Sequence, residues 1–112
     1  MKIVFTLSVL LFIFVGLIQA AAYKGQDQYV KKCVKCHTAG QEFVATKTSA
    51  EWKKLMADGG EPLKSIHINS TKKEAKDSIE YFESTAYTKY SRHLKDFLME
   101  YAKDSGRVPA CN

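Results

Sequence analysis

The sequence lacks the patterns that mark β-sheets, nucleotide sites and serine hydrolases. Among its 112 residues, no segment alternates apolar and polar side chains as a surface strand does. There is no internal repeat or low-complexity segment, and no phosphate-binding loop, dinucleotide fingerprint or Ser/His/Asp constellation stands out. We therefore expect an all-α protein and find no support for nucleotide-dependent or serine-hydrolase chemistry.

A large excess of charge of one sign is also missing. The 17 Lys and Arg residues exceed the 12 Asp and Glu residues by a net charge of only +5. A nucleic-acid-binding protein usually shows a denser basic patch. The modest excess argues against a nucleic-acid partner and favours acidic protein partners.

The one long hydrophobic run lies at the N-terminus. A short basic start precedes the apolar segment Ile3–Ile18 and then small residues that include Ala20 and Ala22. This order is typical of a secretory signal peptide over residues 1–22, cleaved after Ala22 or after Ala20. The alternative is an uncleaved membrane anchor, because the run approaches the ~20 residues of a membrane span. No cysteine lies near the cleavage region, which argues against a lipid anchor, and the mature domain is predicted over residues 23–112.

Cysteine is scarce, but two of its three copies form a motif. Cys33 and Cys36 precede His37 in the pattern Cys-x-x-Cys-His, the attachment signature of a c-type haem. On a helix these positions share one face, so both thiols can form thioethers with the haem vinyl groups while the imidazole reaches the iron. The motif predicts one covalent haem c, bound by Cys33 and Cys36, with His37 as the proximal iron ligand.

Two other interpretations of these cysteines stay open. A zinc site could recruit Cys33 and Cys36 with a histidine and Cys111, provided that the C-terminus folds back. A redox dithiol would need no adjacent histidine, and its thioredoxin-like context requires a preceding strand that this sequence lacks. Outside these schemes Cys111 is the odd cysteine, so we expect a monomer, with a dimer linked through Cys111 as the alternative.

Apolar periodicity and capping signals predict a series of helices after the leader. The first is expected over about 25–37 and ends before a turn at Gly40. The last is expected over about 85–106, with Leu94 and Phe97 on its apolar face. The segments expected between them are a loop over 41–49, a short helix capped at Thr48, a brief helix at Pro62, a loop that contains His67, and a helix over 71–84.

The chain resembles the class I cytochrome c family, whose first helix carries the pattern Gly-x-x-x-aromatic-x-x-x-Cys-x-x-Cys-His. Gly25, Tyr29, Cys33, Cys36 and His37 match this pattern in full. The resemblance implies a small all-α domain wrapped around one covalent haem. A mature chain of about 90 residues has a marginal core of its own, so a covalently held haem would also stabilise it.

The same resemblance implies a helix crossing and a location. In the family, the last helix crosses the first near its glycine and aromatic positions and brings a leucine and an aromatic residue there. Leu94 with Phe97, or Leu98 with Tyr101, can supply this pair. Haem attachment in bacteria follows export, so the resemblance and the signal peptide together imply a periplasmic protein.

The distal iron ligand is where the sequence departs from the family. The family usually supplies a methionine well before the last helix, but the stretch 72–90 contains neither Met nor His, and the family's loop after the haem histidine is missing. His67 is the leading candidate and Met56 the main alternative, ahead of His93 and Met99. An iron with an open position is the remaining option. Two histidine ligands would lower the reduction potential relative to His/Met, because methionine raises it.

These observations predict an electron carrier rather than an enzyme. The iron would alternate between its ferric and ferrous states, and Lys31, Lys32 and Lys35 could steer acidic redox partners to the haem edge. The same lysines are equally compatible with an ordinary solvated helix surface. The alternative functions are a haem enzyme or gas-binding module with an open iron position, and a haem subunit of a larger oxidoreductase.

Overall fold

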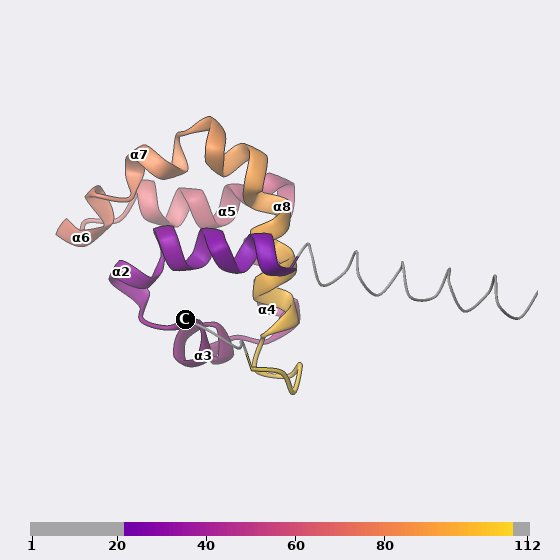
Figure 1. The fold of residues 1–112 in the computed structure, drawn as a ribbon. Helices are drawn as coiled ribbons and strands as arrows, with labels where there is room; N and C mark the ends of the chain where they lie inside the picture. The colour runs from indigo at the N-terminus through magenta and orange to yellow at the C-terminus, as the bar shows by residue number, and fades with distance from the viewer. Residues whose placement is uncertain (1–21, 109–112) are drawn as a thin grey trace, which may run out of the picture.

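The computed structural model describes residues 22–108, which form helices and turns with no strand among them (Figure 1). The elements are a first helix over 22–32, α2 (Val34–His37), α3 (Gly40–Phe43), the 3-10 helix η1 (Val44–Thr46), α4 (Ser49–Leu55), α5 (Ala57–Ile68), α6 (Lys73–Lys76), α7 (Ile79–Phe82) and α8 (Thr85–Glu100). The all-α prediction is confirmed for these residues. The predicted signal peptide, apart from Ala22, and Cys111 lie outside them. None of the helices within 22–108 is long and apolar enough to cross a membrane.

The first helix crosses α8, and their close contact joins the two ends of the domain (Figure 1). A Cβ atom on Gly25 would lie 2.0 Å from the His93 carbonyl oxygen and 2.6 Å from the Phe97 Cβ, so only glycine permits this approach. Four residues later, Tyr29 packs against Phe97 with ring centroids 5.4 Å apart. Leu94, which lies on α8 like Phe97, is also buried. The predicted crossing is therefore present, and Phe97 is the aromatic residue that makes it.

The predicted capping box at Thr48 is confirmed. The Thr48 hydroxyl accepts the Glu51 backbone N–H at 3.2 Å, and the Glu51 carboxylate accepts the Thr48 N–H at 2.8 Å. In the helix that begins here, Trp52 is buried and donates its indole N–H to the Val44 carbonyl oxygen at 2.9 Å. The loop expected over 41–49 is wrong for most of its length, because this segment packs against Trp52 as α3 and η1.

Three expected helices are also wrong in part. The single helix expected over 25–37 is interrupted by a turn at Cys33 before α2 begins, although its expected end at His37 is confirmed; the residue with positive φ that follows is Thr38, at 67°, and not Gly40. The single helix expected over 71–84 is divided into α6 and α7. The last helix ends at Glu100. Capping signals and apolar periodicity predicted where these helical segments lie, but not the turns that interrupt them.

The segment that carries His67 is helical, contrary to the expected loop. Within α5, three successive residues have positive φ, namely Asp58 at 51°, Gly59 at 69° and Gly60 at 84°. Regular helix begins beyond them, with Pro62 in its first turn as predicted. The imidazole is therefore held by a helix that starts from a sharp hinge, and not by a loop.

Candidate functional site

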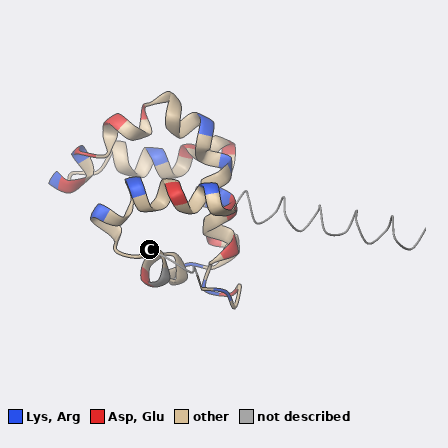
Figure 2. Ribbon diagram, in the orientation of Figure 1, with Lys and Arg blue, Asp and Glu red and all other residues tan. Residues whose placement is uncertain are grey.

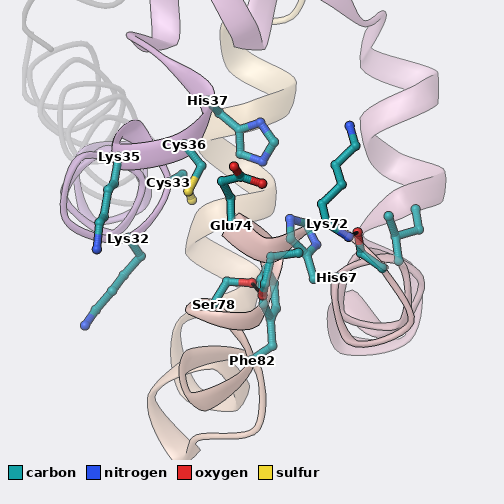
Figure 3. A pocket seen from close by; sticks show the side chains of 13 residues that line it. Lys32, Cys33, Lys35, Cys36, His37, His67, Lys72, Glu74, Ser78 and Phe82 are labelled. Atoms are coloured by element: carbon teal, nitrogen blue, oxygen red, sulfur yellow. Dashed lines mark hydrogen bonds between the residues drawn. The ribbon is translucent and has the colours of Figure 1, made fainter.

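A cavity of about 640 Å³ opens between α2, the end of α5 and the α6–α7 segment. Its lining includes all three functional residues of the motif, Cys33, Cys36 and His37, together with His67. Figure 3 shows the two thiols and the His67 imidazole entering from opposite sides. The remaining lining residues are Lys32, Lys35, Ile66, Ser70, Lys72, Glu74, Ala75, Ser78 and Phe82. The volume lies within the roughly 300–1,000 Å³ typical of cofactor sites.

The two thiols belong to one helical turn at the wall of the cavity. The Cys33 N–H donates to the Tyr29 carbonyl at 2.8 Å, and the His37 N–H donates to the Cys33 carbonyl at 3.0 Å. The Tyr29 hydroxyl donates to the Thr38 carbonyl at 2.9 Å and so holds the turn behind His37. Burial, with a further contribution from Cys36, raises the pKa of the Cys33 thiol to about 12. Reactive dithiols have a lowered thiol pKa, so the raised pKa of Cys33 does not support the dithiol interpretation.

The His37 imidazole is fixed by an aromatic partner on the following element. It stacks on Phe43 with ring centroids 4.2 Å apart and planes 20° apart, and Phe43 packs edge-on against Trp52 at 5.8 Å. Burial, followed by the charges of His67 and Lys72, lowers the pKa of His37. A neutral imidazole has a lone pair available for a metal, which suits the role of a ligand.

His67 faces His37 across the cavity. The ring centroids lie 5.9 Å apart and the ring planes meet at 83°. The Nδ1 atom of His67 lies 2.7 Å from the Leu63 carbonyl oxygen, so Nδ1 carries the proton and Nε2 keeps its lone pair. The ring also stacks on Phe82 at 4.3 Å. Metal-binding histidines typically show this arrangement, in which one ring nitrogen is held by a backbone carbonyl and the other is free.

The other candidate distal ligands do not line the cavity. Met56 is buried in the core cluster that includes Trp52, where it fills space as a core methionine does. Met99 is half-buried against the same core. The Nδ1 atom of His93 is buried without a hydrogen-bond partner, near the helix crossing. Of the four predicted candidates, only His67 is brought to the Cys-x-x-Cys-His motif.

The residues that line the cavity are compatible with a haem. Within residues 22–108, no three His, Cys, Asp or Glu side chains are close enough to hold a metal together, and the Cys111 of the zinc scheme lies outside that range. Iron in a porphyrin takes only two axial ligands from the protein. Two metal–imidazole bonds of about 2 Å, plus the distance from each nitrogen to its ring centre, separate the centroids by about 6 Å. The 5.9 Å between His37 and His67 agrees with that spacing.

Several residues of the site were missed or grouped differently by sequence reasoning. Phe43 lies in a segment without apolar periodicity, so no local signal marked it as the partner of His37. Lys72, which was not among the lysines expected near the haem, also lines the cavity. Of the three lysines expected near the haem edge, Lys32 and Lys35 line the cavity, whereas Lys31 pairs with Asp27 at 2.9 Å.

No family model, no curated protein and no solved structure matches the chain. The interpretation of the cavity therefore rests on the residues that line it.

Proposed function

We propose that this protein is an exported electron carrier that holds one covalent haem c in the cavity between the Cys-x-x-Cys-His motif and His67. The observation that carries the proposal is the opposition of His37 and His67 at a spacing that suits two axial ligands of one iron. The two histidines come from α2 and α5, thirty residues apart in the sequence. The attachment motif and the distal imidazole are therefore independent indications of the same group.

Each residue of the site has a defined role in this proposal. The Cys33 and Cys36 thiols each add across one vinyl group: a carbon–sulfur bond forms, the thiol hydrogen passes to the second vinyl carbon, and no oxidant is consumed. His37 and His67 would hold the iron, His37 as the motif's own ligand and His67 as the second. When bound, the haem supplies a one-electron iron couple. Phe82 and Ala75 contribute apolar surface to the lining, against which a porphyrin ring could pack.

Two bound imidazoles leave the iron no open position, which favours electron transfer over gas binding or catalysis. The Nδ1 of His67 is held by the Leu63 carbonyl, so the ligand is already oriented before it binds metal. A methionine ligand would raise the reduction potential, so a carrier with two histidines works at a lower potential.

The charges around the cavity favour an acidic redox partner. Three lysines line it, Lys32, Lys35 and Lys72, against one acidic residue, Glu74, while elsewhere acidic and basic residues are interspersed along the helices (Figure 2). Cations beside the haem edge would steer an acidic docking face and accelerate encounter at low salt. The signal-like sequence of the N-terminus supports a periplasmic location for this encounter.

The test is production of the full chain in a host that attaches haem to exported proteins. We expect an intact mass increased by one haem and a low-spin absorption spectrum in both oxidation states. The Cys33→Ala/Cys36→Ala double variant should lose the covalent haem, whereas Cys111→Ala, outside the motif, should retain it.

Two outcomes would contradict the proposal. A colourless protein with the mass of the bare polypeptide would remove the haem altogether. A high-spin haem that takes up carbon monoxide at once would instead favour the gas-binding or enzymatic alternative, with His67 unbound.

A further inference from the structure

We propose that Tyr87 is a positioning residue for the distal ligand, and that its hydroxyl group limits how readily His67 leaves the iron. This inference rests on the proposed haem function. Tyr87 lies on α8, is 2% exposed, and does not line the cavity. It acts on His67 by two routes, one through the backbone of α5 and one through an aromatic ring.

The backbone route starts at the hinge of α5. The Tyr87 hydroxyl donates to the Gly60 carbonyl oxygen at 2.6 Å in a buried contact. Gly60 is the last residue with positive φ before the regular helix that carries His67. A Cβ atom at Gly60 would lie 2.2 Å from the Tyr87 hydroxyl oxygen, so the two groups are packed too closely for any side chain between them. The hydroxyl therefore fixes the point from which the His67 helix departs.

The aromatic route leads directly to the imidazole. The Tyr87 ring meets Phe82 edge-on, with centroids 4.8 Å apart and planes at 70°. Phe82 in turn stacks on His67, with ring centroids 4.3 Å apart. Tyr81 packs against both Tyr87 and Phe82 at 5.5 Å and closes the cluster. The stacked ring of Phe82 thus limits lateral movement of the His67 imidazole, and the edge-on ring of Tyr87 limits movement of Phe82.

Tyr87 also relates the distal side of the cavity to the proximal side. α8 carries Tyr87 near its N-terminal end and Phe97 at the crossing with the first helix, which leads into Cys33. Burial raises the pKa of the Tyr87 hydroxyl, with smaller contributions from Cys33 and Glu61, so it stays a proton donor at neutral pH. The same helix, α8, therefore contacts the distal side of the cavity through Tyr87 and the first helix through Phe97.

The experiment measures carbon monoxide uptake by the ferrous holoprotein, because carbon monoxide can bind only after His67 leaves. Tyr87→Phe keeps the ring contacts and removes only the hydroxyl. We expect uptake to become about tenfold faster, the factor that corresponds to one buried hydrogen bond. Phe97→Leu is the control: it weakens the helix crossing on the same α8, so it should lower the thermal unfolding midpoint and leave the uptake rate within about twofold of the wild type.

Each outcome bears on the proposal. A Tyr87→Phe rate equal to that of the wild type, or an equal acceleration in Phe97→Leu, would overturn the role of Tyr87 while the proposed function stands. If Tyr87→Phe does not fold, Phe82→Leu, which removes the ring stacked on His67, must accelerate uptake, and an unchanged rate overturns the proposal. A wild-type protein without covalent haem would refute the proposed function and the role of Tyr87 with it.

Discussion

Under the proposed function, His67 is the residue on which the chemistry of the cavity depends, because it would determine whether a bound iron has a free position. The sequence around it is unremarkable: two isoleucines flank a histidine in a segment expected to be a loop. Its position opposite His37, with Nδ1 on the Leu63 carbonyl, gives it the properties of a ligand. A histidine without a sequence motif of its own thus gains the properties of a ligand only through its tertiary contacts.

Replacing His67 tests this directly. His67→Met should keep a six-coordinate, low-spin iron and raise the reduction potential on the order of 0.1 V, within the span of about 0.8 V that axial ligands cover. His67→Ala should give a high-spin spectrum and rapid carbon monoxide binding. Potentiometry and absorption spectra measure both changes.

His93→Ala is the matched control, because His93 lies on α8 and does not line the cavity. Its spectrum should match that of the wild type. A low-spin spectrum that survives in His67→Ala would show that another residue occupies the distal position.

At the scale of elements, the three residues with positive φ near the start of α5 determine where His67 lies. Asp58, Gly59 and Gly60 turn the chain in the left-handed region, which glycine adopts without strain and other residues do not. The two glycines differ in their surroundings. Gly59 is open, with nothing within 4 Å of a Cβ atom, whereas Gly60 is packed against the Tyr87 hydroxyl.

This difference predicts unequal costs for the same substitution. Gly59→Ala should lower the free energy of unfolding by about 1 kcal/mol, from backbone strain alone. Gly60→Ala should lower it by about 3 kcal/mol or more, because the strain is joined by the loss of a buried hydrogen bond and by a clash. Urea denaturation of the holoprotein measures both values. Equal losses would mean that the Gly60–Tyr87 contact contributes nothing to stability.

At the scale of the whole molecule, one helix crossing closes the domain. The first helix and α8 approach so closely at Gly25 that an added Cβ atom would meet the His93 backbone and Phe97. The crossing brings together the helix that leads into the motif and the helix that positions α5 through Tyr87. Loss of this contact should therefore lower the stability of the whole domain.

Gly25→Ala should destabilise the protein by about 2–3 kcal/mol, because the two helices must separate to accommodate the methyl group. Val30→Ala, on the exposed face of the same helix, should change stability by no more than about 0.5 kcal/mol. Thermal or urea unfolding of the two holoproteins provides the comparison. A Gly25→Ala protein as stable as Val30→Ala would show that the two helices can repack around the added methyl group without loss of stability.

The sequence by itself determined the features that depend on neighbouring residues. The helical class, the capping box of Thr48 and Glu51, and the placing of Cys33 and His37 beside one another follow from spacings of one to four residues, which a single helical turn converts into contact. The crossing near Gly25 was expected from the resemblance of the two helices to a known pattern.

Only the tertiary structure decided which distant residues complete the site. Met56, His67, His93 and Met99 were all eligible in the sequence, and only His67 lines the cavity. The choice follows from the hinge at Gly60 and the contacts of Phe82, none of which leaves a local pattern in the chain. Contacts between elements depend on how whole helices pack against one another, so they appear only when the crossing and the hinge are both in place.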